Sequence, residues 1–197
     1  MKDNIVQAEN SGNNSGIIVG ENKGIIQVSL QETIKIPSLI AKVVQALGVA
    51  CSEVDESSEL YNLEEYKPDE KLTYNCVIRY KYIIKEYAMY YMYCDNFLNI
   101  YDDSNIRGKA RILKCVHLWY LAAKGKVLSE NQDSDEQEME LIRKNSDRII
   151  DLVKERIVET IRNTNELGGI CREDLELGIA CFTCYCFMEC KILEKPK

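Results

Sequence analysis

Hydrophobic positions recur at helical spacing through most of the sequence beyond residue 37. From Leu72 to about Tyr101 apolar residues return every three or four positions, and the same spacing runs from about Glu136 to Asn163. This period is typical of amphipathic α-helices. Two further helices are predicted over about Ile106–Ala123 and Arg172–Leu193. The pattern predicts an all-α fold, a helical bundle of about four main helices.

The spacing also predicts which side chains face the core of this bundle. The first long helix should bury Val77, Tyr80, Ile84, Tyr87, Tyr91, Cys94 and Leu98. The second should bury Ile106, Ala110, Leu113, His117, Tyr120 and Leu121. The third should bury Ile142, Ser146, Ile149, Ile150, Val153, Ile157 and Ile161. Each set lies on one side of its helix.

A different pattern occupies the start of the chain. Residues 12–27 read GNNSGIIVGENKGIIQ, so the motif G-x-N-x-G-I-I-x occurs twice in succession. Asn and Gly favour turns, and β-branched residues favour short strands. Two such strands need a partner, which the body of the same chain, another copy of it or the sheet edge of another protein could supply. We therefore expect residues 1–36 to form an Asn/Gly-rich β-repeat arm that drives oligomerisation. The candidate residues are Asn14, Gly16, Ile17, Ile18, Val19, Asn22, Gly24, Ile25 and Ile26.

Between the arm and the bundle lies a segment of mixed character. Residues 37–68 are predicted to hold one short helix and an acidic linker. Pro37 suits a first helical turn, and the helix should run over Ser38–Leu47 and end at Gly48. The helical bundle domain is then assigned to residues 69–197.

Charge is unevenly placed along the chain, although the net charge is only −7. Residues 71–126 carry ten basic and four acidic side chains, between the acidic stretches 51–70 and 127–140. The acidic stretches are interpreted as solvated linkers, and a basic surface for nucleic acid is the alternative. That alternative would use Lys81, Lys85, Arg107, Lys109, Arg111 and Lys114.

The cysteines suggest a reducing environment. Four of the nine cysteines lie within residues 181–190, but an ideal helix places them as two pairs on opposite faces. Buried free thiols are therefore favoured over a metal centre, and whether the cluster is redox active stays open. The N-terminus has no secretory h-region, and the longest apolar run, residues 179–188, is too short to span a bilayer. We expect a cytoplasmic protein without membrane contact.

No catalytic signature is visible in the sequence. The glycine repeat lacks the Lys-Ser or Lys-Thr of a phosphate-binding loop and opens β-branched runs rather than a helix. His117 is the only histidine and lies on the predicted apolar side of a helix, which favours a core or interface role. We expect neither enzyme activity nor a cofactor or metal.

Three stretches carry a family resemblance. PDEKLTYNCVIRYKYIIKEYAMYY, GKARILKCVHLWYLAAKG and EDLELGIACFTCYCFMECKILEKP resemble the C-terminal helical domain of the bacterial ABC-three-component conflict systems. The matching positions open the first helix and close the last. They are Lys71, Leu72, Tyr74 and Asn75, then Cys190, Lys191, Ile192, Leu193, Glu194 and Pro196. The resemblance covers residues 66–197.

The resemblance implies a role in defence against phage and plasmids. In that family the helical domain links an effector, often a nuclease or peptidase, to an ABC- or SMC-like ATPase and a small middle component. Here the preceding segment is too short for a typical effector enzyme. We therefore expect a non-enzymatic adaptor that self-associates and binds the ATPase or effector. A standalone inhibitor that occupies an effector's docking site is the close alternative.

Overall fold

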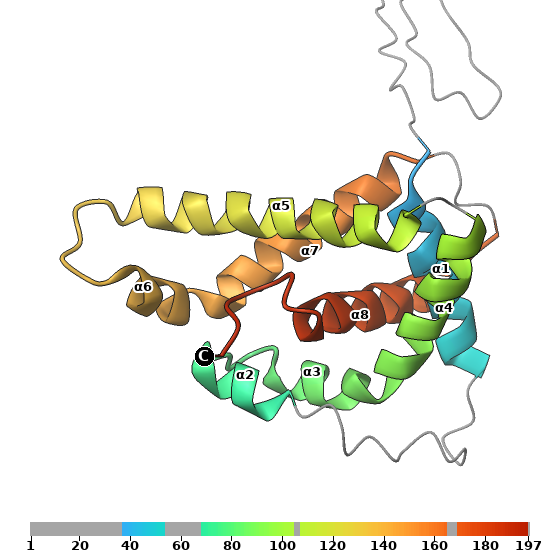
Figure 1. Ribbon diagram of the computed structural model, residues 1–197, viewed down its shortest axis with the longest axis horizontal. Coiled ribbons are helices and arrows are strands. Elements are labelled where there is room, and N and C mark those ends of the chain that lie inside the picture. Colours follow the sequence, from blue (N-terminus) through green and yellow to red (C-terminus); the bar gives the residue numbers. More distant parts are fainter. Residues whose placement is uncertain (1–36, 54–67, 105–106, 165–168, 197) are drawn as a thin grey trace, which may run out of the picture. The chain divides into compact units, whose positions relative to one another are not determined.

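A computed structural model of the protein describes residues 37–53, 68–104, 107–164 and 169–196. All regular structure in these ranges is helical, without a strand (Figure 1). The chain divides into two compact units, residues 1–33 and 34–197, and every described residue belongs to the second. The predicted β-repeat arm and its oligomerisation residues lie outside the described ranges, so they stay a prediction.

The helices follow one another along the chain with few irregular connections. Their bounds are α1 (Leu39–Glu53), α2 (Asp69–Tyr74), α3 (Lys81–Tyr87), the 3₁₀ helix η1 (Ala88–Tyr90), α4 (Tyr91–Ser104), α5 (Gly108–Glu130), α6 (Glu138–Lys144), α7 (Ser146–Arg162) and α8 (Arg172–Met188).

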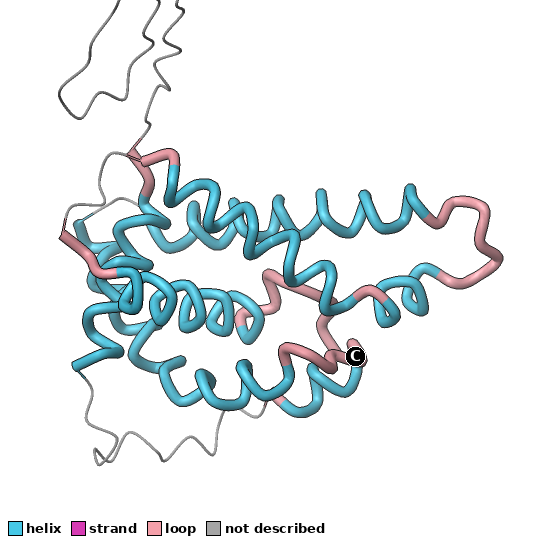
Figure 2. The backbone as a smooth tube through the Cα atoms, turned by 180° about the vertical axis from the view of Figure 1, so that it is seen from behind, coloured by secondary structure: helices cyan, strands magenta, loops and turns pink. Residues whose placement is uncertain are grey.

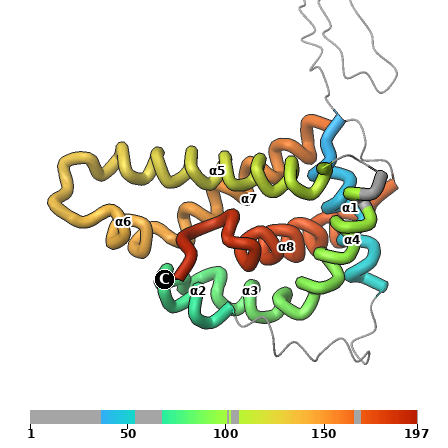
Figure 3. Tube along the Cα trace, in the orientation of Figure 1, coloured from blue at the N-terminus to red at the C-terminus, as the bar shows by residue number. Residues whose placement is uncertain are grey.

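The last helix, α8, lies in the middle of the described unit. It packs against α1, α3, α4 and α7, and Figure 3 shows it between the α5 side and the α2–α3 side. The antiparallel pair formed by α5 and α6–α7 extends beyond the end of α8, as the view from behind also shows (Figure 2). Residues Cys181–Phe187 are all buried, so α8 has no solvent face over this stretch. A helix that is apolar all round belongs in a core.

The α1–α8 contact brings two backbones together. A Cβ atom on Gly178 would lie 2.0 Å from the carbonyl oxygen of Val44, and one on Gly48 would lie 1.9 Å from that of Asp174. Only glycine leaves room for this approach. Gly48 therefore lies inside α1, and the prediction that it ends the helix is wrong.

The four-helix prediction is right about helical content and wrong about where helices end. The helix predicted from Leu72 to Tyr101 is broken after Tyr74, where Asn75 turns inward and Cys76 takes a positive φ of 52°. The helix predicted over 136–163 is broken at Asn145. There the Asn145 side chain donates to the Leu141 carbonyl at 2.9 Å, and this local bond competes with the helical backbone.

Two other helix ends were also predicted wrongly. α5 continues through Gly125 to Glu130 rather than stopping at Ala123. α8 ends at Met188 rather than Leu193, because the Lys71 ammonium binds the Phe187 carbonyl and Cys190 takes a positive φ of 53°.

The predicted core stripe is correct for the 136–163 segment and partly wrong for α5. The stripe of the 136–163 segment is buried at every predicted position. In α5 the predicted stripe is wrong at Leu121, which is 48% exposed, and at Ala110, which is also exposed. The buried face of α5 is instead Ile112, Leu113, Val116, Tyr120, Ala123 and Val127. Because α5 carries apolar residues on both sides, its periodicity does not identify the buried face.

Candidate functional site: an apolar groove and a buried polar cluster

The residues that carry the family resemblance meet in space. Lys71 and Asn75, at α2, contact the tail that follows α8, residues 189–196. We call Lys71, Asn75 and Glu194 the tail clamp. The Lys71 ammonium donates to the carbonyls of Phe187 and, at 2.9 Å, of Ile192.

Asn75 completes the tail clamp with a reciprocal pair of bonds. Its side-chain amide donates to the Glu194 carbonyl at 2.8 Å, and its side-chain oxygen accepts from the Glu194 backbone N–H at 3.0 Å. The amide also donates to the Lys71 carbonyl at 3.0 Å. Asn75 is fully buried. Its polar atoms are thus satisfied inside the protein, as buried polar groups require.

Burial sets the protonation of the tail clamp. Lys71 is 6% exposed, and desolvation lowers its pKa to about 8, although Cys190 and Glu194 oppose the shift. Burial alone would raise the pKa of the Glu194 carboxyl. Hydrogen bonds from Lys124 at 2.7 Å and the Tyr120 hydroxyl at 2.6 Å outweigh burial and lower that pKa. Every member of the cluster is engaged with the protein itself, so its geometry is that of a fold anchor.

A groove opens on another side of the unit, between α3, α7 and α8. Its volume is about 970 Å³, at the upper end of the range for small-ligand sites. Its lining is mainly apolar. The apolar residues are Ile83, Ile84, Tyr87, Val158, Ile161, Leu175, Leu177, Ile179 and Ala180. Ile83 is 40% exposed although it is a large aliphatic residue.

Charged residues stand along the edges of this groove. On α7 these are Lys154 and Arg162, neither of which forms an ion pair with a described residue. On α8, Arg172 and Glu176 pair with each other at 3.0 Å. The α7 edge therefore offers two cations beside an apolar floor, and the lining also includes the carboxylate of Glu173 on α8.

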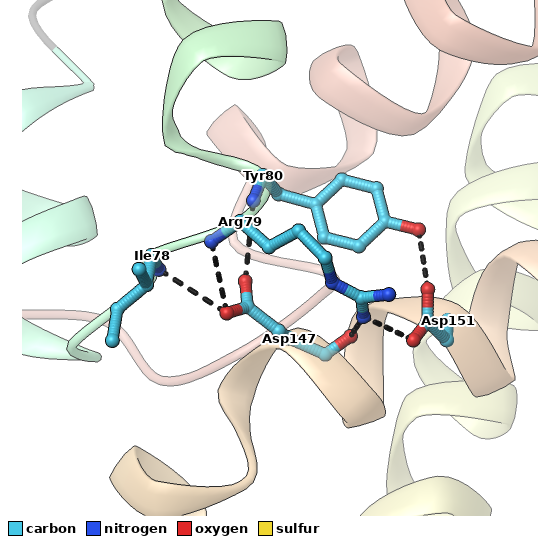
Figure 4. A network of polar contacts seen from close by, with 5 residues as sticks. All are labelled: Ile78, Arg79, Tyr80, Asp147 and Asp151. Carbon is cyan, nitrogen blue, oxygen red and sulfur yellow. Dashed lines mark hydrogen bonds and ion pairs between the residues drawn. The ribbon is translucent and has the colours of Figure 1, made fainter.

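A polar network fixes the α3 edge of the groove to α7 (Figure 4). The Asp147 carboxylate accepts hydrogen bonds from the backbone N–H groups of Ile78, Arg79 and Tyr80 at 3.3, 3.0 and 3.2 Å. Asp151 accepts from the Tyr80 hydroxyl at 2.6 Å and pairs with the Arg79 guanidinium. Because Tyr80 also lines the groove, the network sets the distance between its α3 and α7 walls.

The six candidate nucleic-acid contacts do not come together on one surface. Lys81 and Lys85 lie on α3, whereas Arg107, Lys109, Arg111 and Lys114 lie at the start of α5. These helices lie at opposite edges of the unit in Figures 1 and 2. Lys85 pairs with Asp69, and Lys109 pairs with Asp95 at 2.6 Å. Exposed cations without a described partner remain mainly on α5.

The cysteine cluster is split by the end of α8. Cys181, Cys184 and Cys186 are buried, as predicted, whereas Cys190 lies in the tail beyond the helix. Within the described ranges, no three His, Cys, Asp or Glu side chains are grouped so that they could hold a metal ion. The described helices also include none with the length and hydrophobicity of a membrane span.

Neither the groove nor the tail clamp was predicted as a site. The tail clamp residues carry the family resemblance, but their contacts join distant segments of the sequence: Asn75 and Glu194 are 119 residues apart. The groove joins α3 to α7 and α8, two consecutive helices that lie far along the chain from α3. Its one local indication is Ile83, an isoleucine outside the predicted stripe.

No family model, curated protein or solved structure matches the chain. The resemblance to the ABC-three-component domain therefore stays a prediction, and the functional argument rests on the groove and its surroundings.

Proposed function

We propose that this protein is a non-enzymatic docking subunit that binds a partner protein in the α3–α7–α8 groove. The observation that carries the proposal is a large groove with an apolar floor and two cations, Lys154 and Arg162, on its α7 edge. Such a surface suits an amphipathic segment, whose apolar side chains enter the groove while its carboxylates face Lys154 and Arg162. Burying Ile83 and the neighbouring apolar lining would supply the affinity.

The family resemblance supplies the setting of this proposal. We propose that the partner is the ABC- or SMC-like ATPase, or the effector, of a multi-component defence system. The tail clamp residues that carry the resemblance form their hydrogen bonds within the protein. We therefore assign partner binding to the groove. A standalone inhibitor would use the same groove, because it would bind the partner protein in place of the effector. The nucleic-acid alternative would rest on Arg107, Arg111 and Lys114 of α5.

Co-purification with the products of neighbouring genes tests the proposal. The chain is expressed with an ATPase or effector encoded by a neighbouring gene, and the molar mass of the complex is measured by light scattering. Ile83→Asp places a charge on the apolar floor, and Lys154→Glu reverses the cationic edge. Each should weaken binding about tenfold or more. Leu118→Asp is the matched control, because Leu118 is 62% exposed on α5 and lies outside the groove.

Each outcome of this experiment decides something. Loss of binding in both groove variants, with Leu118→Asp unaffected, supports docking in the groove. Equal binding by all three variants removes the groove from the proposal. If no neighbouring product binds, the adaptor role itself is wrong. Native mass spectrometry that finds a small apolar molecule in the groove would replace the protein partner with a ligand.

A further inference from the structure

A pair of thiols lies where α1 and α8 approach most closely. Cys51 follows Gly48 by three residues, and Cys181 follows Gly178 by three residues. Because both glycines let the backbones touch, the two cysteines are brought side by side one turn further along. Their Sγ atoms are 3.1 Å apart, although 130 residues separate them in sequence.

The surroundings make this pair unlike the other cysteines. Cys51 is 6% exposed and Cys181 is 1% exposed. All nine cysteines lie in the described ranges, and only these two place their sulfurs within hydrogen-bond distance of each other. A disulfide requires the sulfurs to move about 1 Å closer.

The contact also shifts the pKa values of the two thiols in opposite directions. The hydrogen bond between the two thiols lowers the pKa of the Cys51 thiol, and burial opposes that shift. The same contact and burial raise the pKa of the Cys181 thiol. Cys51 also lies in the last turn of α1, where helices open most readily. Cys51 is therefore the first of the two to meet an oxidant.

We propose that Cys51 and Cys181 form a reversible redox modification site that crosslinks α1 to α8. Hydrogen peroxide is the oxidant. The Cys51 thiolate attacks one peroxide oxygen, the O–O bond breaks, and Cys51 sulfenic acid forms with release of water. The Cys181 thiol then attacks the sulfenic sulfur, the S–O bond breaks, and a second water leaves. Two thiols and one peroxide thus give one disulfide and two waters.

The crosslink would join the first described helix to the last. α1 is the first described helix, and residues 1–36 precede it. A disulfide across 130 residues strongly restricts the unfolded chain, so the oxidised protein should hold α1 on α8 more firmly. This inference does not rest on the proposed docking function, because it concerns the α1 side of α8 and not the groove.

Peptide mapping after oxidation is the direct test. The full chain is treated with hydrogen peroxide, the remaining thiols are alkylated, and the digest is analysed without reductant. The expected result is a linked Cys51–Cys181 peptide that disappears after reduction with dithiothreitol. The melting temperature should rise by roughly 5–10 °C on oxidation and fall back on reduction.

Variants separate this pair from general thiol oxidation. Cys51→Ala and Cys181→Ala should each abolish the linked peptide and the thermal shift. Cys184→Ala is the matched control, because Cys184 is 2% exposed on the same helix, and it should keep both. Two free alkylated cysteines in peroxide-treated wild-type protein would overturn the proposal, as would a linked peptide from another pair. This mapping needs no variant, so a misfolded alanine variant does not block the test.

Discussion

α8 is held by two contacts of opposite chemistry. Along α1 the contact is apolar and so close that Gly48 and Gly178 leave no space for a Cβ atom. At the C-terminal end of α8, Lys71 and Asn75 hold the backbone by hydrogen bonds through the tail clamp. The first contact depends on volume, whereas the second depends on the identity of single polar atoms. They should therefore fail under different substitutions and different conditions.

The largest effect is expected where volume decides. Gly178→Ala places a Cβ atom 2.0 Å from the Val44 carbonyl oxygen, so the two helices must separate. We expect a loss of about 3 kcal/mol or more in the free energy of unfolding, measured by urea denaturation. Gly125→Ala is the matched control, because nothing lies within 4 Å of its Cβ position. That variant should gain about 0.5–1 kcal/mol from helix propensity. Equal behaviour of the two variants would refute the close α1–α8 approach.

A smaller effect is expected where atom identity decides. Asn75→Ala removes the acceptor of the Glu194 N–H and the amide that donates to the Lys71 and Glu194 carbonyls. The free energy of unfolding should fall by about 2–3 kcal/mol. The control is Asn99→Ala, which removes two exposed hydrogen bonds, one to Asp95 and one from Lys109. If both asparagine variants are equally stable, the tail clamp does not anchor α8.

A second polar contact, the network of Figure 4, joins residues 78–80 to α7. Asp147→Ala leaves three backbone N–H groups of residues 78–80 without their carboxylate acceptor. We expect a loss of about 1–2 kcal/mol in the free energy of unfolding, as for loss of a helix cap. Asp133→Ala, at an exposed position between α5 and α6, should change stability little. A similar loss in both variants would indicate a general charge effect.

The remaining expected effect is a dependence on pH. The pKa of Lys71 is about 8 in the folded protein, below its ordinary value of 10.5. Between these values the unfolded chain keeps a proton that the folded chain has released, so rising pH favours folding. Wild type should therefore gain stability relative to Lys71→Met between about pH 7 and about pH 9.5.

Thermal melts at both pH values measure this gain. The phenols of Tyr80, Tyr120 and Tyr185, whose pKa values burial raises, are present in both proteins, so their contribution largely cancels. Lys126→Met is the control for removal of an exposed lysine. A stability difference that is constant with pH would show that Lys71 stays charged in the folded protein.

The comparison also explains what the sequence could predict. The helical class and the stripe from Ile142 to Ile161 follow from local spacing and are confirmed. Gly48 and Gly125 look like helix ends locally, yet both lie inside helices. Position 48 must be glycine because α8 packs against it, and no local sequence pattern predicts where α8 lies. The inward turn at Asn75 likewise depends on Glu194, far along the chain.

The candidate site was less predictable than the fold for the same reason. The groove requires α3, α7 and α8 to be placed side by side, and spacing along one helix does not determine which helices become neighbours. The basic residues illustrate the reverse case. Lys81 and Arg111 belong to one charged segment of the sequence, but folding places them on different helices at opposite edges.

The α1–α8 contact also has a consequence for how the protein is made. It joins the first described helix to the last, so the ribosome releases α1 long before its partner exists. Until α8 emerges, the apolar side chains of α1 have no cover from it and remain available to chaperones and proteases. A chain interrupted before residue 172 would keep the apolar side of α1 exposed. Completed synthesis of α8 is thus what covers this surface.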